Sequence, residues 1–302
     1  VISRDVFHQQ SAMNLSDVLR NTPGITFTAG ENGNVNTGDS FFMRGADSSN
    51  AIFIDGVRDS GIYSRDVYNL DQVEIAKGPA SDNGRANPGG YINLSTKTPH
   101  LESFQAGTVS YGLDETDADA RSRATLDVNE VLASSPVAGT AVRFNALWQE
   151  GGVPGREIAE NNRWAVAPSL ALGLGTPTRA VVAFEHFEQN NLPEFGVPSP
   201  VISEIVPTNF GSAIARDNFY GLRTDYDDVE SDSLTVRLEH DLRPDLRLTN
   251  QTRYGFLERK ALYTSFSAYN ITPPNPTPAT PVNASRQSNF RTNEILSNLT
   301  NL

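Results

Sequence analysis

The sequence predicts two structural parts, a small α+β domain in residues 1–98 and long antiparallel β-strands in residues 103–302. Two observations lead to this prediction. Short apolar runs separated by glycine turns fill the first part, and segments of about ten residues with alternating apolar and polar side chains follow Lys97. Alternation with a period of two is typical of a strand whose two faces have different surroundings.

A short helix is predicted at residues 14–22. Asn14 is a favourable N-cap residue, and a Pro-Gly pair follows the last turn and ends the helix. Three apolar residues fall on one face of this helix: Leu15, Val18 and Leu19. Residues 41–45 and 52–56 are then predicted to form two short apolar strands, each closed by a glycine turn.

A segment rich in glycine and proline joins two further β-like runs, residues 73–76 and 91–96. Glycine adopts backbone conformations that a Cβ atom forbids, and it lets the backbone approach another surface closely. We therefore predict a compact, tightly turned connection in which several glycines are structurally required. These glycines are Gly78, Gly84, Gly89 and Gly90.

Residues 73–97 closely resemble the signature near the end of the plug domain of TonB-dependent outer-membrane receptors. The helix, a strand ending in Arg-Gly, a strand ending in Asp-Gly and the glycine-rich connection also follow the order of that domain. Residues 55–66 are similar to the ferric-catecholate branch of the family. The resemblance implies that residues 1–98 form a plug. It also implies that residues 103–302 form the N-terminal part of a transmembrane antiparallel β-barrel, which has about 22 strands when complete.

Eight strands are predicted after the plug. Their approximate bounds are 103–112, 121–131, 140–150, 163–173, 179–189, 231–242, 246–258 and 290–302. The alternation alone also fits a soluble sandwich with one solvated face. However, short joins alternate with long ones, which is the layout of an outer-membrane barrel, and the longest exceed what a compact soluble domain carries. Trp148 and Trp164 flank one long loop, where an aromatic girdle would lie.

Composition excludes several classes of protein. The 302 residues carry a formal net charge of −12 and no cysteine, which rules out a disulfide framework or a thiolate metal site. The acidic balance argues against nucleic-acid binding. No apolar run reaches the roughly 20 residues of a membrane helix. We find neither a signal peptide at Val1 nor a TonB box, and eight strands are fewer than a closed barrel needs, so we expect the chain to be part of a longer receptor.

Enzyme chemistry is not predicted. The four histidines are scattered without metal-ligand spacing, and neither a Gly-x-Ser-x-Gly nor a P-loop pattern occurs. One acidic run lacks the spacing of a calcium loop and is therefore predicted to be a solvated loop: Asp225, Asp227, Asp228, Glu230 and Asp232. No metal and no cofactor are expected.

The resemblance also implies how the plug is held. In related receptors, two basic positions of the plug pair with carboxylates on the barrel wall, and Arg44 and Lys77 occupy these positions. Together with Glu74 they form the predicted contact between plug and barrel, with wall partners beyond Leu302. A partly desolvated charge pair is costly to leave with one partner missing, so such pairs would hold the plug until TonB pulls. The alternative is a contact within the plug, between Lys77 and Glu74.

Substrate contacts are expected from three outward plug loops, residues 28–39, 46–50 and 57–66. A ferric tris-catecholate is anionic and has aromatic faces. Arginine suits it through charge, donor geometry and stacking, and tyrosine offers a flat face with a hydroxyl group. The predicted ligand-binding residues are Asn32, Ser48, Arg58, Tyr63 and Arg65. The alternative for each is an ordinary loop residue.

The preferred hypothesis is a receptor in the outer membrane of a Gram-negative bacterium that imports a ferric siderophore, in the first place a catecholate. The expected partners are the siderophore, TonB through a segment missing from this chain, and outer-membrane lipid, and the receptor is expected to be a monomer. A second hypothesis keeps the fold and changes the cargo to a hydroxamate siderophore, haem, cobalamin or an oligosaccharide. A third is a soluble β-rich enzyme or carbohydrate-binding module.

Overall fold

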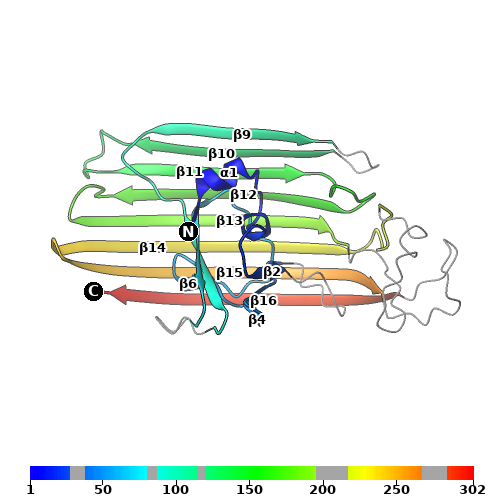
Figure 1. Cartoon of the computed structure of the whole chain (residues 1–302). Coiled ribbons are helices and arrows are strands. Elements are labelled where there is room, and N and C mark those ends of the chain that lie inside the picture. Colours follow the sequence, from blue (N-terminus) through cyan, green and yellow to red (C-terminus); the bar gives the residue numbers. More distant parts are fainter. Residues whose placement is uncertain (28–37, 80–86, 114–119, 195–216, 267–283) are drawn as a thin grey trace, which may run out of the picture.

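The computed structural model describes residues 1–27, 38–79, 87–113, 120–194, 217–266 and 284–302. Within them the plug consists of two short helices and short strands that lie across one face of a large sheet (Figure 1). The helices are α1 (Arg4–Gln9) and α2 (Leu15–Leu19). The strands are β1 (Ile2–Ser3), β2 (Ile25–Phe27), β3 (Phe41–Met43), β4 (Ala46–Asp47), β5 (Ile52–Ile54), β6 (Val57–Arg58), β7 (Leu70–Lys77) and β8 (Gly90–Thr96). They form two sheets, ordered β1-β7-β8-β5-β6 and β2-β3-β4.

The plug has its own apolar core. Helix α2 begins as predicted, because the Asn14 side chain accepts a hydrogen bond from the Asp17 backbone N–H at 2.9 Å. Its apolar face belongs to the same buried cluster as residues of β3, β5, β7 and β8. The cluster comprises Phe7, Leu15, Val18, Leu19, Ile25, Phe41, Met43, Ile52, Ile54, Val67, Leu70, Val73, Ile92 and Leu94. Helix α1 is not predicted by the sequence pattern, since only Phe7 of its six residues is buried.

The glycine-rich connection between β7 and β8 contains backbone that only glycine adopts easily. Gly78 has φ of +105° and Gly90 has φ of +124°. Two of the four glycines that the sequence marks as structurally required therefore have a backbone conformation that other residues rarely adopt. Gly84 lies outside the described residues.

Close approach of other chain segments constrains the same connection. A Cβ atom at Gly90 would lie 1.9 Å from the carbonyl oxygen of Ala76, and one at Gly89 would lie 2.4 Å from that of Met43. Both distances are far below van der Waals contact. Gly89 and Gly90 therefore let β8 pass directly against its neighbours in the plug.

Eight antiparallel strands form one sheet, called the wall below, in the sequential order β16 to β9. The strands are β9 (Phe104–Gly112), β10 (Arg121–Val131), β11 (Ala141–Glu150), β12 (Glu160–Leu172), β13 (Thr178–Leu192), β14 (Tyr226–Arg243), β15 (Leu246–Phe266) and β16 (Ala284–Asn301). Connections at one end are short: 132–140, 173–177 and 244–245. At the other end, connections 193–225 and 267–283 are far longer, whereas 113–120 and 151–159 are about as long as 132–140. No helix occurs in the described part of the wall, as predicted.

The two faces of the wall differ as the alternation predicts. The inner face contacts the plug, and on β11 it buries Arg143, Asn145 and Gln149. The outer face carries apolar side chains, among them Phe144 and Trp148, which are 39% and 48% exposed. This arrangement fits a barrel that has lipid outside and a polar lumen inside.

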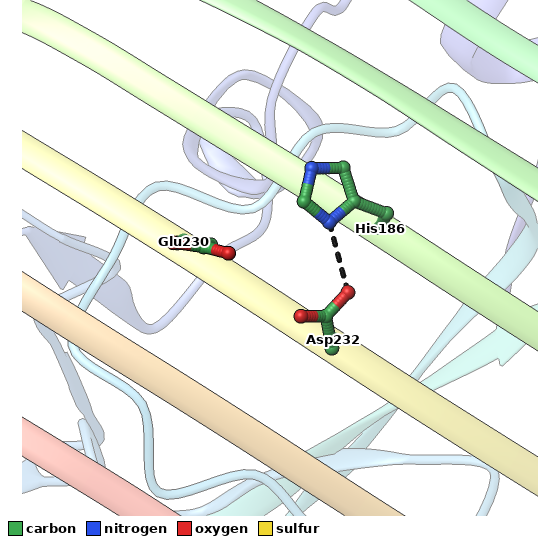
Figure 2. A group of neighbouring side chains, drawn as sticks. All are labelled: His186, Glu230 and Asp232. Atoms are coloured by element: carbon green, nitrogen blue, oxygen red, sulfur yellow. Dashed lines mark hydrogen bonds and ion pairs between the residues drawn. The ribbon is translucent and has the colours of Figure 1, made fainter.

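The last three strands are longer than predicted. Four residues of the acidic run lie in strand β14, and Asp225 precedes the strand but is buried, so the run is not a solvated loop. Asp227 is 2% exposed and accepts a hydrogen bond from Arg259 Nε at 2.7 Å. Glu230 and Asp232 point from the same strand to the outer face, beside His186 (Figure 2). Charged residues on both faces of β14 remove the apolar alternation by which a strand is recognised, and this explains the error.

Among the described residues, no helix is long and apolar enough to cross a membrane. The eight wall strands match the number predicted for this chain. The boundary between a plug in residues 1–98 and a barrel portion in residues 103–302 stays a prediction, as does the total of about 22 strands.

Candidate functional site: the plug–wall interface and the outward plug segment

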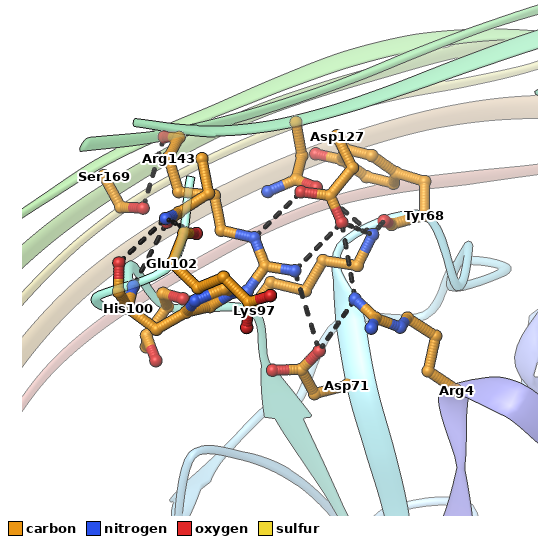
Figure 3. A network of polar contacts seen from close by, with 12 residues as sticks. Arg4, Tyr68, Asp71, Lys97, His100, Glu102, Asp127, Arg143 and Ser169 are labelled. Atoms are coloured by element: carbon orange, nitrogen blue, oxygen red, sulfur yellow. Dashed lines mark hydrogen bonds and ion pairs between the residues drawn. The ribbon is translucent and has the colours of Figure 1, made fainter. Parts of the chain in front are cut away.

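The plug meets the inner face of the wall through polar side chains (Figure 3). Lys97, which follows β8, is 8% exposed and lies between the two parts. Its Nζ donates hydrogen bonds to the Tyr68 carbonyl oxygen at 2.6 Å and to Asn145 Oδ1 at 3.2 Å, and it lies 2.9 Å from Asp127 Oδ2. Burial lowers the pKa of Lys97, and the Asp127 carboxylate opposes that effect. All three ammonium protons therefore have an acceptor.

Asp127 on β10 is shared by basic side chains from both parts of the molecule. Arg143 on β11 donates to its two carboxylate oxygens at 2.8 and 2.9 Å. Arg4, the first residue of α1, places Nη1 3.6 Å from Asp127 and 3.7 Å from Asp71 of β7. One wall carboxylate is thus connected to the N-terminal helix of the plug and, through Lys97, to its C-terminal strand.

Asp66 is the reverse case, a plug carboxylate held by wall arginines. Arg123 of β10 donates to its two oxygens at 2.8 and 2.7 Å, which is the bidentate geometry that arginine forms best. Arg163 of β12 lies 3.5 Å away. Arg123 also donates to Gln149 of β11 at 2.9 Å. All of these side chains are buried, so the contact is shielded from water and from salt screening.

Neutral donors complete the interface. Glu185 on β13 accepts a hydrogen bond from the Tyr68 hydroxyl at 2.9 Å and from Asn69 Nδ2 at 3.3 Å. Gln251 on β15 donates to the carbonyl oxygen of Asp55 at 2.8 Å. Asn293 on β16 donates to Ser60 Oγ at 3.4 Å, and Tyr63 and Tyr68 of the plug also share an apolar cluster with wall residues such as Phe187. The plug therefore contacts the wall from β10 to β16, mostly through individual polar groups and at one place through apolar packing.

The predicted plug–barrel residues lie elsewhere. Lys77 donates to the Pro23 carbonyl oxygen at 2.7 Å at an exposed site. Glu74 accepts hydrogen bonds from Gln72 at 2.9 Å and Asn93 at 3.1 Å, all within the plug. Arg44 is exposed, and within the described residues no ion pair joins it to the wall. The role assigned to Arg44, Glu74 and Lys77 stays a prediction, because their expected partners lie beyond this chain.

Sequence reasoning did not identify the contacts that the structure shows. The usable signal was the charged half of the alternating strands, to which Arg123, Asp127 and Arg143 belong. A buried charge needs a partner, so charged inner-face residues require opposite charges on the plug. Nothing in the spacing shows that Asp66 and Lys97 supply them.

Residues 57–66 form a segment tied together by Arg65. Its guanidinium lies 3.1 Å from Asp39 and 2.9 Å from Asp59, and it covers the Tyr63 ring at 4.3 Å. Burial raises the pKa of Asp39 although Arg65 counteracts it. Burial would also raise the pKa of Asp59, but Arg65 and the Gly61 backbone N–H hold it below its ordinary value. The Arg65 guanidinium thus offsets the effect of burial only in part at Asp39, whereas at Asp59 it outweighs burial with the help of the Gly61 N–H.

Tyr63 and Arg65 were expected to be exposed loop residues, and this is wrong, since they are 9% and 4% exposed. The reason is electrostatic: Arg65 is the counter-charge that allows Asp39 and Asp59 to be buried. The Tyr63 hydroxyl also donates to Asp59 at 3.0 Å. Whether these side chains touch a ligand stays a prediction.

The other predicted ligand residues are separated. Arg58 is exposed, covers the Phe53 ring at 5.1 Å and donates to the Asn50 carbonyl oxygen at 2.6 Å. It lines a cavity of about 40 Å³ together with Tyr63. Ser48 is fully buried and hydrogen-bonded to Asn87 at 3.1 Å, so it is not the outward donor that was expected. Asn32 lies outside the described residues.

These features define a class of protein: a small domain with its own core, held by buried ion pairs against the polar inner face of a sheet whose outer face is apolar. Residues 1–91 match the TonB-dependent receptor plug domain family. The whole chain is 41% identical to the catecholate siderophore receptor Fiu of Escherichia coli K12 and covers 40% of that protein. It is also 41% identical, over 84% of its length, to a probable TonB-dependent receptor, BfrD, of Bordetella pertussis, of which it covers 33%.

Solved structures agree with the sequence relatives. The crystal structure of the ferric-catecholate import receptor Fiu from E. coli K12 superposes with a TM-score of 0.83 at 36% identity, over 99% of this chain and 44% of that one. The structure of the siderophore receptor PiuA from Acinetobacter baumannii superposes with a TM-score of 0.77 at 32% identity. The match covers 88% of this chain and 37% of that one. The chain belongs to the TonB-dependent receptors of the Gram-negative outer membrane. It spans about two fifths of the length of the relatives that it matches.

Proposed function

We propose that the receptor containing this chain imports a ferric catecholate siderophore across the outer membrane with energy delivered by TonB. The observation that carries the proposal is the 41% identity to Fiu, which extends through the plug and all eight wall strands. The resemblance of residues 55–66 to the ferric-catecholate branch points to the same class of cargo. A hydroxamate siderophore, haem, cobalamin or an oligosaccharide is the alternative cargo.

In the proposed mechanism no covalent bond is made or broken, so the protein is a transporter and not an enzyme. The ferric complex binds above the plug on the side of the long connections. Arg58 is the best direct contact among the described residues, because it is exposed and its charge suits an anionic aromatic complex. Tyr63 and Arg65 hold the segment that presents it. Nucleic acid has no part in the function, and we expect a monomer surrounded by lipid.

Release of the plug is the second half of the mechanism. TonB would pull on the chain that precedes the plug in this family. Arg4 stands closest to that end of the chain among the interface residues, and it bridges Asp71 of the plug and Asp127 of the wall. Displacing it would weaken the ion pairs around Asp127 first, while the apolar core of the plug stays intact.

The test is uptake by the full-length receptor. Cells that lack other catecholate receptors would be given radioactive iron as a ferric catecholate or as a ferric hydroxamate, with a strain lacking TonB as the control. We expect TonB-dependent accumulation from the catecholate alone. Equal uptake from both complexes, or catecholate uptake without TonB, would contradict the proposal.

A further inference from the structure

A group of three potential metal ligands lies on the outer face of the wall, on the opposite side from the plug (Figure 2). His186 comes from β13, and Glu230 and Asp232 come from β14. One ligand atom from each residue lies within 4.8 Å of the others. Side chains on this face cannot reach the lumen, so the group takes no part in cargo binding as proposed above.

Strand geometry brings the three side chains together. His186 is directly opposite Asp232 in the β13–β14 ladder, and Glu230 points to the same face two residues earlier on β14. His186 Nδ1 and Asp232 Oδ1 are 2.8 Å apart. The imidazole also packs against Trp164 of β12, with ring centroids 4.8 Å apart. The histidine is therefore held in place before any ion binds.

The charge around Glu230 is unbalanced. Glu188 and Glu258 are its direct neighbours on β13 and β15, and like charges directly opposite one another destabilise a sheet. Glu188 accepts a hydrogen bond from Trp164 Nε1 at 2.9 Å, and Glu258 contacts Lys260 at 2.5 Å. Within the described residues, no hydrogen bond or ion pair stabilises Glu230 itself. Lys260 acts on Glu230 only through longer-range attraction, and one lysine leaves this group of carboxylates short of positive charge.

The group also lies near the membrane surface, where ions from the water can reach it. Trp148 and Trp164 are direct neighbours across β11 and β12, and Glu188 is the next residue in the same row. Tryptophans of this kind mark the boundary between hydrocarbon and headgroups in membrane barrels. The next outward-facing pair after His186 and Asp232, toward the short turns, is Phe184 and Leu234, where the apolar band begins.

We propose that His186, Glu230 and Asp232 bind one first-row divalent cation, in the first place Zn²⁺, at the outer edge of the apolar band. One imidazole and two carboxylates are a ligand set that Zn²⁺ accepts, with a fourth position open to water. Imidazole favours zinc over the oxygen-seeking Mg²⁺ and Ca²⁺. The bound cation would neutralise the repulsion among the three glutamates and fasten β13 to β14.

The experiment uses the full-length receptor in detergent, stripped with a chelator and titrated calorimetrically with Zn²⁺. We expect one saturable equivalent that His186→Ala and Asp232→Asn each weaken by about tenfold or more, since even indirect metal-site changes reach that size. The matched control is His240→Ala. His240 also faces outward from β14, but its Nδ1 is 2.8 Å from a hydroxyl, Thr178 Oγ1, and this variant should bind Zn²⁺ as the wild type does.

A second measurement locates the ion. Co²⁺ at the same site should quench the fluorescence of Trp164, and the quenching should disappear in Trp164→Phe and in His186→Ala. Unchanged siderophore binding and thermal unfolding with chelator present would show that the variants are folded. The proposal is overturned if the wild type binds no Zn²⁺, or if His186→Ala or Asp232→Asn retains wild-type affinity for Zn²⁺. It is also overturned if His240→Ala loses as much Zn²⁺ affinity as His186→Ala, or if the wild type binds Mg²⁺ as tightly as Zn²⁺.

Discussion

The interior of the plug and the surface by which it meets the wall have opposite chemistry. The interior is an apolar cluster drawn from α1, α2 and the plug strands, with residues such as Leu19 and Ile92 fully buried. The interface combines buried ion pairs, such as Asp66 with Arg123 and Lys97 with Asp127, with one apolar cluster in which Tyr63 and Tyr68 of the plug pack against wall side chains. Apolar burial inside the plug holds it folded, whereas the ion pairs give its attachment to the wall a fixed position, so the ion pairs can be broken without unfolding the plug.

This division has a mechanical consequence. Apolar contacts are non-directional and grow with buried area, whereas a buried ion pair weakens strongly once water enters between its partners, because water screens the attraction and hydrates each charge. A plug attached by ion pairs can leave its position as a folded unit or in parts, and it can return to the same pairs. A continuous apolar interface would resist displacement over its whole area.

The largest expected effect is on the folding of the plug itself. Gly90→Ala would place a Cβ atom 1.9 Å from the Ala76 carbonyl oxygen in a residue with φ of +124°, so β7 and β8 could not pair and no protease-resistant plug should form. Gly45→Ala is the matched control, because Gly45 has φ of +82° but nothing within 4 Å of its Cβ position. It should cost only backbone strain of about 1–3 kcal/mol. Equal protease resistance in both variants would contradict the tight approach.

The next largest effect is on attachment. Arg123→Gln removes the bidentate partner of Asp66 and should weaken plug attachment by about 3–5 kcal/mol, since it leaves a buried charge poorly paired. Arg179→Gln is the control, because its partners Glu239 and Asp241 belong to the wall itself. Permeability of cells to large antibiotics should rise for Arg123→Gln only. A rise of the same size in both variants would show that wall damage is the cause.

A smaller effect should separate ligand contact from loop structure. Arg58→Ala should weaken ferric catecholate binding by about 1.5–3 kcal/mol and change stability by less than about 0.5 kcal/mol, because the side chain is exposed. Arg65→Ala should lower both the affinity for the ferric catecholate and the stability of the plug, because it leaves Asp39 and Asp59 without their counter-charge. Titration and thermal unfolding of the full-length receptor in detergent measure the two quantities. If the Arg58→Ala variant binds the ferric catecholate as tightly as the wild type, Arg58 is not part of the binding site.

The smallest effect concerns a neutral contact. Tyr68→Phe removes the hydroxyl that donates to Glu185, while Asn69 still donates to the same oxygen. We expect plug attachment to fall by about 0.5–1.5 kcal/mol, the usual worth of one hydrogen bond. Protease accessibility of the plug measures the strength of attachment. If Tyr68→Phe weakened attachment as much as Arg123→Gln does, the ion pairs would not be the main attachment.

Local sequence patterns predicted the architecture well. The N-cap at Asn14, the glycines with positive φ and the alternation on β11 follow from residues close together in the chain. The ends of β14 and β15 were missed, because polar residues occupy both faces there.

The interface was harder to predict because it depends on pairs distant in sequence. Asp66 and Arg123 are 57 positions apart, and their pairing is set by how the plug sits against the wall. Arg65 was recognised as important, but its partner Asp39 is 26 positions away, so the sequence could not show that it is buried. Spacing along the chain reports secondary structure, whereas these contacts come from the packing of two completed units.

Hydrogen exchange on the full-length receptor carrying both Arg123→Gln and Lys97→Met tests the central claim most directly. If apolar burial folds the plug and ion pairs only attach it, the backbone amides of Ile92 and Leu94 should remain as protected as in the wild type, while protease reaches the plug more readily. Loss of protection at these core amides would show that the plug needs the wall to fold, which would contradict the account.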